Sequence, residues 1–218
     1  MNRREFSTAL LLTTGATGAA LLASGAVSAQ GAGPVEGKDF ARVDPPQPTR
    51  EPGKIEVLEF FSYACPHCST FEPALEAWAK QLPADVVLHR APVTFMTNAD
   101  NFQRTYFALE TTGLVGALQL KIFRAFHIDK VRLEKPEDIA EFVGKNGGDA
   151  TKFLAAFKSF SVATGVARAR KQMADYKIDS VPTLVIAGRF ITSPSMAGGG
   201  PQALAVADQL IQRVRGKG

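Results

Sequence analysis

Cys65 and Cys68 are the only two cysteines among the 218 residues of this chain, and two residues separate them. The run before them, residues 55–61, is apolar, aromatic and β-branched, which is typical of a buried strand. Over residues 71–82 apolar side chains recur at helical spacing, which predicts a helix with Pro73 inside it. The cysteine pair and the two patterns around it therefore predict a strand that leads directly into a helix with a dithiol at its start.

The placement of the two cysteines predicts redox chemistry. A Cys65–Cys68 disulfide closes a very short loop, so it adds little stability, and reactivity explains it better. Cys65 falls at the expected helix N-terminus, where free N–H groups and the helix dipole favour a thiolate. His67 can add positive charge or a hydrogen bond to the sulfur. We expect Cys65 to be the attacking thiol. Cys68, one turn further into the helix and more buried, would be the resolving thiol.

Two other interpretations of the cysteine pair are weaker. A structural zinc ion needs four ligands, and besides His67 the chain has only His89 and His127. His89 alternates with apolar residues in a predicted strand over 86–93, and His127 lies near a predicted helix end, so we expect both to be structural. An inert structural disulfide is disfavoured by the short loop. We expect neither a metal nor a cofactor.

The order of the predicted elements indicates the fold class. A strand and a helix come first, a long helical block follows, and a hairpin and a helix close the chain. That order predicts an α/β protein with a thioredoxin-like fold that carries an inserted α-helical domain. The predicted segments are a thioredoxin-like domain at 54–97 and 177–218, a helical insertion at 98–176, a hairpin at 183–192, a small flexible loop at 195–200 and a last helix at 202–214.

Composition and charge exclude some function classes. Hydrophobic residues make up 45% and charged residues 21% of the chain, as in ordinary globular proteins. The formal net charge is +4, but the basic residues are scattered or mixed with acidic ones. Because no basic patch interleaved with aromatic residues is present, we expect no nucleic-acid partner. We expect a monomer.

The N-terminus has the features of an export signal. Arg3 and Arg4 form a short basic region, a mildly apolar stretch follows, and residues 27–29 offer small side chains for cleavage. We therefore predict a signal peptide at 1–29, by a twin-arginine-like or a Sec route, with a retained anchor as the alternative. Residues 30–53 are rich in Gly and Pro, which predicts a flexible or extended leader. Export suits a reactive dithiol, because disulfides form in oxidising compartments.

The chain resembles the DsbA family of periplasmic thiol:disulfide oxidoreductases, which belongs to the thioredoxin superfamily. The resemblance rests on Val57-Leu58-Glu59-Phe60-Phe61-Ser62-Tyr63-Ala64-Cys65-Pro66-His67-Cys68, on Val181-Pro182-Thr183-Leu184-Val185, and on the helical block between them. The Pro66-His67 dipeptide is the specific part, since thioredoxins typically carry Gly-Pro there. The resemblance covers the chain from about Lys54 onward.

The resemblance implies roles for three further residues. Pro182 would be a cis-proline that faces the disulfide, with the Val181 backbone turned toward a substrate that pairs as an added strand. An ordinary turn proline is the alternative. Glu59 would be a buried acid that relays protons to Cys68, unless its side chain reaches solvent at the strand end.

The function implied is a periplasmic protein dithiol oxidase. It would donate the Cys65–Cys68 disulfide to newly exported, unfolded proteins through a mixed disulfide at Cys65, and a quinone-linked membrane partner of the DsbB type would reoxidise it. A stabilised Cys65 thiolate would make the reduced form the more heat-stable one. The alternatives are a thiol reductase or isomerase of the same fold, a chaperone-like binder of unfolded chains, and a glutathione-dependent transferase, against which Cys68 argues.

Overall fold

The computed structural model describes residues 33–216, and the predicted export signal at 1–29 lies outside them. Within the described residues a five-stranded mixed sheet has the order β1-β5-β4-β2-β3. β2 pairs in parallel with β3, and the other neighbours are antiparallel. The strands are β1 (Ala41–Arg42), β2 (Ile55–Phe61), β3 (Val86–Pro92), β4 (Thr183–Ile186) and β5 (Phe190–Thr192).

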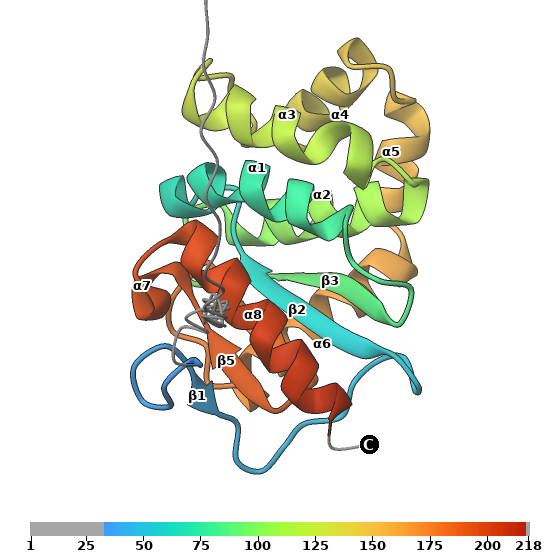
Figure 1. The fold of residues 1–218 in the computed structure, drawn as a ribbon. Helices are drawn as coiled ribbons and strands as arrows, with labels where there is room; N and C mark the ends of the chain where they lie inside the picture. Colours follow the sequence, from blue (N-terminus) through green and yellow to red (C-terminus); the bar gives the residue numbers. More distant parts are fainter. Residues whose placement is uncertain (1–32, 217–218) are drawn as a thin grey trace, which may run out of the picture. The chain divides into compact units, whose positions relative to one another are not determined.

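Helices cover both faces of this sheet, and a block of them lies between β3 and β4 in the chain (Figure 1). The helices are α1 (Pro66–Ala79), α2 (Ala99–Thr112), α3 (Val115–His127), α4 (Pro136–Lys145), α5 (Ala150–Phe157), α6 (Phe160–Asp175), α7 (Pro194–Ala197) and α8 (Gly200–Arg215). The predicted fold class, a thioredoxin-like α/β fold with added helices, is confirmed. None of the helices within residues 33–216 has the length and apolar character that crossing a bilayer requires.

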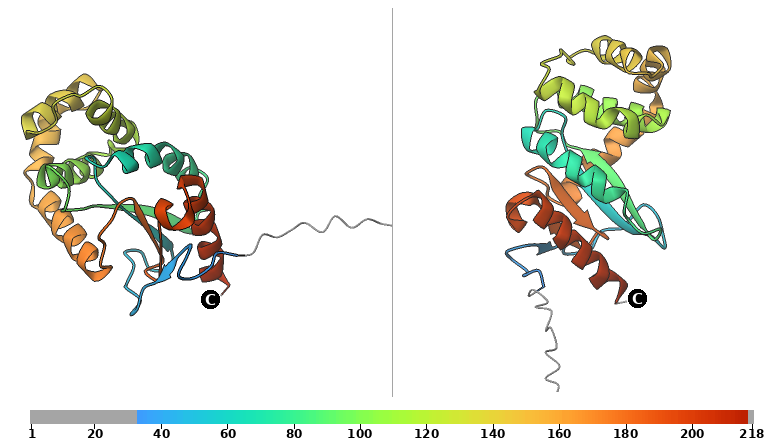
Figure 2. Two further views of the ribbon diagram at one scale, coloured as in Figure 1. Left: turned by 90° about the vertical axis from the view of Figure 1, so that its left-hand side faces the viewer. Right: turned by 45° about the horizontal axis from the view of Figure 1, so that its top comes forward.

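Strand β2 lies inside the sheet and is buried on both faces, which explains its nearly continuous apolar sequence. Its side chains alternate between two cores. Val57 packs in the core that α1 and α8 cover, with Leu75 and Leu210. Leu58 and Phe60 belong to the core on the side of α2 and α6. Figure 2 shows α8 and α6 on opposite sides of the sheet.

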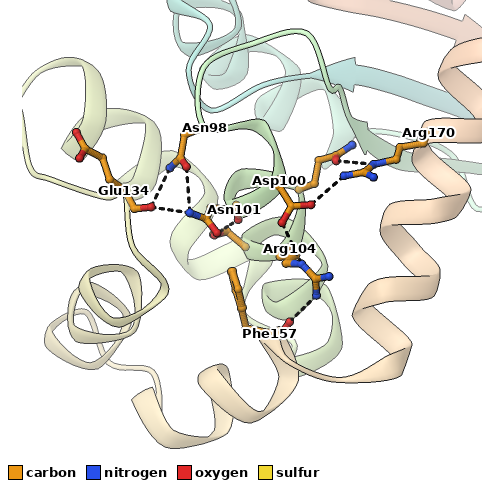
Figure 3. A network of polar contacts seen from close by, with 9 residues as sticks. Asn98, Asp100, Asn101, Arg104, Glu134, Phe157 and Arg170 are labelled. Carbon is orange, nitrogen blue, oxygen red and sulfur yellow. Dashed lines mark hydrogen bonds and ion pairs between the residues drawn. The ribbon is translucent and has the colours of Figure 1, made fainter.

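The helical block is tied together by polar contacts as well as by its core (Figure 3). The Asp100 carboxylate on α2 accepts from Arg104 at 3.3 Å and from Arg170 on α6 at 2.9 Å. The Asn101 amide donates to the Glu134 carbonyl oxygen in the segment before α4, at 2.6 Å. These bonds join α2 to the segment before α4 and to α6.

The segment expected to be a flexible or extended leader differs from that expectation over residues 33–53. It contributes β1, which pairs with β5, and it places Phe40 in the core. The ring of Phe40 meets that of Phe190 edge to face, with centroids 5.6 Å apart. Gly and Pro lower the propensity to form a strand, but an unpaired edge of the sheet can pair even with a two-residue strand.

The stretch at 195–200, expected to be a small flexible loop, is mostly helical. The short helix α7 begins at Pro194, and the Ser193 hydroxyl caps it by accepting from the Met196 N–H at 3.2 Å. Helix α8 then begins at Gly200 rather than at 202. The Ser-Pro pair explains the difference, because Ser is a favoured N-cap and Pro a favoured first helical residue.

A candidate dithiol site at the start of α1

The Cys65 sulfur caps helix α1. Cys65 is the N-cap residue, in an extended conformation, and its Sγ accepts from the Cys68 N–H at 3.3 Å. Pro66 follows as the first helical residue, where its missing N–H costs nothing. Both cysteines are free thiols here. Cys65 is 3% exposed and Cys68 is fully buried, which agrees with the expected order of exposure.

The surroundings of the two sulfurs give the two thiols different pKa values. A hydrogen bond from the Cys68 thiol is the largest cause that lowers the pKa of Cys65, to about 6. Burial opposes it, while the backbone N–H groups of Cys68 and His67 and the charge of His67 lower the pKa further. Burial raises the pKa of Cys68, and the hydrogen bond to Cys65 adds to that rise. One thiolate is favoured at neutral pH, and it is on Cys65.

Val181 and Pro182 lie beside the Cys65 sulfur although they are more than 100 residues away in the chain. The Cys65 Sγ is 3.6 Å from the Val181 carbonyl oxygen, and the Val181–Pro182 peptide bond is cis, as the resemblance implies. The antiparallel pairing of β2 with β4 produces this proximity, because Phe60 near the end of β2 pairs with Thr183 at the start of β4. The loop before β4 is thereby placed next to the start of α1.

An open, mostly apolar groove lies between α1, the Val181–Pro182 loop and the start of α8. Its volume is about 450 Å³. The side chains that line it include those of His67, Phe71, Ala74, Pro182, Pro194 and Pro201. His67, which lines the groove, and Pro66 are both exposed, whereas the two sulfurs are buried.

Glu59 is fully buried, so its side chain does not reach solvent at the strand end. It accepts from Arg90 Nε at 2.8 Å, and these two residues are register partners on the parallel strands β2 and β3. The same guanidinium donates to Glu72 at 3.0 Å and to Glu76 at 2.7 Å, both on α1. Three carboxylates therefore surround one guanidinium.

Burial is the main cause that raises the pKa of Glu59, to about 7, against the opposing charge of Arg90. Burial also raises the pKa of Glu72 well above its usual range, and the charge of Glu59 adds to it. One carboxylate oxygen of each of these two residues has no hydrogen-bond partner among the described residues. Because one positive charge cannot balance three negative ones in a dry site, the group favours keeping a proton.

Sequence reasoning singled out Glu59 but missed its partners. Two signals were available. Glu72 and Glu76 stand four residues apart, so they share one face of the helix. Arg90 lies in the strand predicted to follow the helix, where alignment with the first strand can place it opposite Glu59.

The remaining histidines have separate structural contacts. His89 Nε2 lies 2.9 Å from a Glu51 carboxylate oxygen. His127 Nε2 lies 2.7 Å from the carbonyl oxygen of Tyr63, two residues before Cys65. Within residues 33–216 no group of three or more His, Cys, Asp or Glu side chains could hold a metal ion.

Comparison with known proteins connects this geometry to a family. The family model described as DSBA-like thioredoxin domain matches residues 56–210. The thiol:disulfide interchange protein DsbA of Bordetella pertussis is 40% identical over 206 residues, which cover 94% of this chain and 96% of that protein. The DsbA of Pseudomonas aeruginosa is 36% identical over 82% of this chain and 85% of its own length.

Solved structures show the same relationship in three dimensions. The crystal structure of Pseudomonas aeruginosa DsbA superposes with a TM-score of 0.81 at 35% identity, covering 84% of this chain and 95% of that one. The structure of reduced DsbA1 from Neisseria meningitidis gives a TM-score of 0.77 at 28% identity, over 86% and 98% of the two chains.

Proposed function

Because the chain belongs to the DsbA family of thiol:disulfide oxidoreductases, we propose that it donates the Cys65–Cys68 disulfide to newly exported proteins in the periplasm. The observation that carries this direction of transfer is the Cys65 sulfur at the N-cap of α1. There the Cys68 N–H and thiol both favour its thiolate. A stabilised thiolate is a good leaving group and favours the reduced protein, which makes the oxidised protein an electron acceptor.

The transfer has two steps. A substrate thiolate attacks the Cys65 sulfur, an S–S bond forms between substrate and Cys65, and the Cys65–Cys68 bond breaks with the electron pair on Cys68. A second substrate thiolate then attacks the substrate sulfur of this mixed disulfide, and Cys65 leaves as a thiolate. The substrate is oxidised by two electrons, and the protein is left as a dithiol.

Substrate positioning falls to the Val181–Pro182 loop and the apolar groove. The Val181 backbone lies next to the sulfur, so an extended chain can pair with it as an added strand. The groove along Phe71 and Pro182 suits the apolar side chains that an unfolded protein exposes. His67, which lines the groove, and the exposed Pro66 next to Cys65 in the chain would complete this surface.

Glu59 is the group we propose as the proton donor to Cys68. When the disulfide opens, Cys68 must take a proton, because burial disfavours its thiolate. Glu59 is charge-coupled to Cys68, and its pKa of about 7 leaves it partly protonated at neutral pH. Glu76, the most exposed carboxylate of the group around Arg90, offers a link to solvent.

The cellular setting is proposed from the family and the N-terminal sequence. A quinone-linked membrane protein of the DsbB type would restore the disulfide. A twin-arginine-like or Sec signal at 1–29 would direct export, and the chain would act as a monomer. The thioredoxin-like domain at 54–97 and 177–218 would carry the dithiol, and the insertion at 98–176 would cover one side of it.

The test is the equilibrium of the cysteine pair with glutathione buffers, together with oxidation of a reduced, unfolded model protein. We expect a strongly oxidising potential and rapid oxidation by the wild type. Cys65→Ser should abolish oxidation, and Glu59→Gln should slow opening of the disulfide at neutral pH. Cys68→Ser has no disulfide to donate, so it is mixed with a disulfide-bonded model protein instead. Its Cys65 thiolate should attack that disulfide, release one substrate thiolate and accumulate as the mixed disulfide. A thioredoxin-like reducing potential would contradict the proposal and favour a reductase. If Cys65→Ser prevented aggregation but lost all oxidation, a separate chaperone activity would be present.

A further inference from the structure

Tyr63 connects the end of β2 to the dithiol, and α3 holds it by its backbone carbonyl and its hydroxyl. Tyr63 is fully buried, two residues before Cys65. Its carbonyl oxygen accepts from His127 Nε2 at 2.7 Å. Its hydroxyl donates to the Gln119 side-chain oxygen in a short hydrogen bond. The backbone and the side chain of one residue are thus bonded to the same helix.

The three residues of α3 that contact Tyr63 share one face of the helix. Gln119, Phe123 and His127 follow one another at intervals of four residues, so they are stacked along the axis. The Phe123 ring packs on the Tyr63 ring with centroids 5.1 Å apart. This contact lies between the two hydrogen bonds, and it fixes the register of α3 against the segment before Cys65.

His127 is itself held in place. Its ring is stacked on that of Phe123 at 6.3 Å and meets Phe126 edge to face at 5.1 Å. A carbonyl oxygen can only accept, so Nε2 must carry the hydrogen, which fixes the donor. The segment after α3 is anchored too, because the amides of Asn98 and Asn101 donate to the Glu134 carbonyl (Figure 3).

A fixed Tyr63 carbonyl has consequences for Cys65. The carbonyl belongs to the planar Tyr63–Ala64 peptide unit, so a bond to His127 sets the orientation of that plane. Within the same turn the Cys65 N–H donates to the Ser62 carbonyl oxygen at 3.1 Å. The direction in which Cys65 leaves the turn therefore depends on the orientation of the Tyr63–Ala64 peptide.

We propose that His127 is a positioning residue for the dithiol: by donating to the Tyr63 carbonyl, it holds the Cys65 sulfur at the N-cap of α1. The inference rests on the proposed role of Cys65 as the attacking thiol. It assigns to the helical block a part in the chemistry of the site, in addition to covering it.

The test compares three variants of the full mature chain in reduced and oxidised form. His127→Leu removes the donor, His127→Gln keeps an N–H donor of similar reach, and His89→Leu removes a histidine hydrogen bond elsewhere. The readouts are the pKa of the Cys65 thiol, from thiolate absorbance, and the equilibrium constant with glutathione. Thermal unfolding is measured in parallel.

We expect His127→Leu to raise the pKa of Cys65 by roughly half a unit and to make the protein about threefold less oxidising, since a pKa shift reports differential stabilisation of the thiolate. His127→Gln should restore most of both values. His89→Leu should affect only thermal stability. A His127→Leu protein that melts at a lower temperature but keeps the wild-type pKa of Cys65 and equilibrium constant would overturn the proposal. A His127→Gln protein whose pKa and equilibrium constant are shifted as far as those of the leucine variant would overturn it too.

If His127→Leu does not fold, His127→Asn replaces it. Asparagine keeps a polar amide, but its side chain is too short to reach the carbonyl, so the same contrast with His127→Gln is preserved. Failure of the proposed function gives a different result. In that case the wild-type protein itself would be a reducing dithiol. If only this inference failed, the wild type would be oxidising, and His127→Leu would have the same Cys65 pKa and equilibrium constant as the wild type.

Discussion

At the scale of single residues, the Cys65 sulfur serves as both the helix cap and the reactive group of the site. It accepts from the Cys68 N–H at the first turn of α1. The thiolate is therefore stabilised by bonds that a disulfide sulfur, which carries no charge, makes only weakly. The fold favours the reduced state at this position.

This preference predicts that the reduced protein is more stable than the oxidised one, by an amount that grows with pH. The pKa of Cys65 in the folded protein, about 6, is below the 9.0 usual for a cysteine thiol. An acid whose pKa is lower in the folded than in the unfolded state stabilises the fold. This stabilisation is complete above the unfolded-state pKa and is lost as the pH falls through the folded-state pKa. The gap between the two melting temperatures should widen from pH 6 to pH 9. Thermal unfolding of both forms across this range checks it.

The contribution of Cys68 does not reverse the sign in this window. Its pKa is raised, so it opposes the reduced form only once the pH rises into the range in which an unfolded thiol ionises, at the upper end of this window. Coincident melting curves for the two forms at pH 8 would contradict a stabilised Cys65 thiolate.

At the scale of elements, the β4–β5 hairpin holds the Val181–Pro182 loop in register with β2. Its turn places Ala187 and Gly188 at positive φ, 52° and 65°. Two positive φ values are the signature of the tight hairpin turn that matches strand twist. The Gly188 carbonyl also accepts from the Gln47 N–H at 2.9 Å, so this turn anchors the segment before β2 as well.

Gly188→Ala should destabilise the protein by about 2 kcal/mol, a strained-backbone cost, and lower the melting temperature by several degrees. A Cβ at position 188 would lie 2.0 Å from the Gln47 carbonyl oxygen, and that oxygen is backbone, so it cannot simply rotate away. Gly116→Ala on α3 is the matched control. It has open space around it, and alanine suits a helix better, so stability should stay level or rise. Equal effects of the two substitutions would show that the turn tolerates a side chain.

At the scale of the whole molecule, the start and the end of the described chain pack on each other. Phe40, before β1, lies against Phe190 on β5, and the Arg213 guanidinium on α8 sits 4.9 Å above the Phe40 ring. Strand β1 covers the edge of β5 that would otherwise present unpaired backbone groups. The N-terminal segment from residue 33 onward is therefore part of the folded unit.

Phe40→Ala should therefore cost about 3–5 kcal/mol of unfolding free energy, the usual range for deleting a buried aromatic ring. Chemical denaturation of the oxidised protein measures it. Val35→Ala is the control from the same segment, because Val35 is 52% exposed and should change stability by less than about 0.5 kcal/mol. If the two substitutions had equal, small effects, residues 33–53 would contribute little to the folded unit.

The features that depend on local pattern followed from the order of the residues alone. The apolar run over β2, the helical spacing of α1, the cysteine pair between them and the hairpin before the last helix were all predicted from neighbouring residues, because strand and helix periods appear within a few turns of chain. The placement of Cys65 at a helix start followed from the same local signals.

The contacts that join distant segments, in contrast, arise only when the chain folds. The register of β2 against β3 places Arg90 beside Glu59, and the packing of α1 brings Glu72 to the same guanidinium. The face of α3 places His127 on the Tyr63 carbonyl. Each of these contacts depends on strand register or helix rotation, which a single chain's periodicity leaves open and which is set when the elements pack together to exclude water.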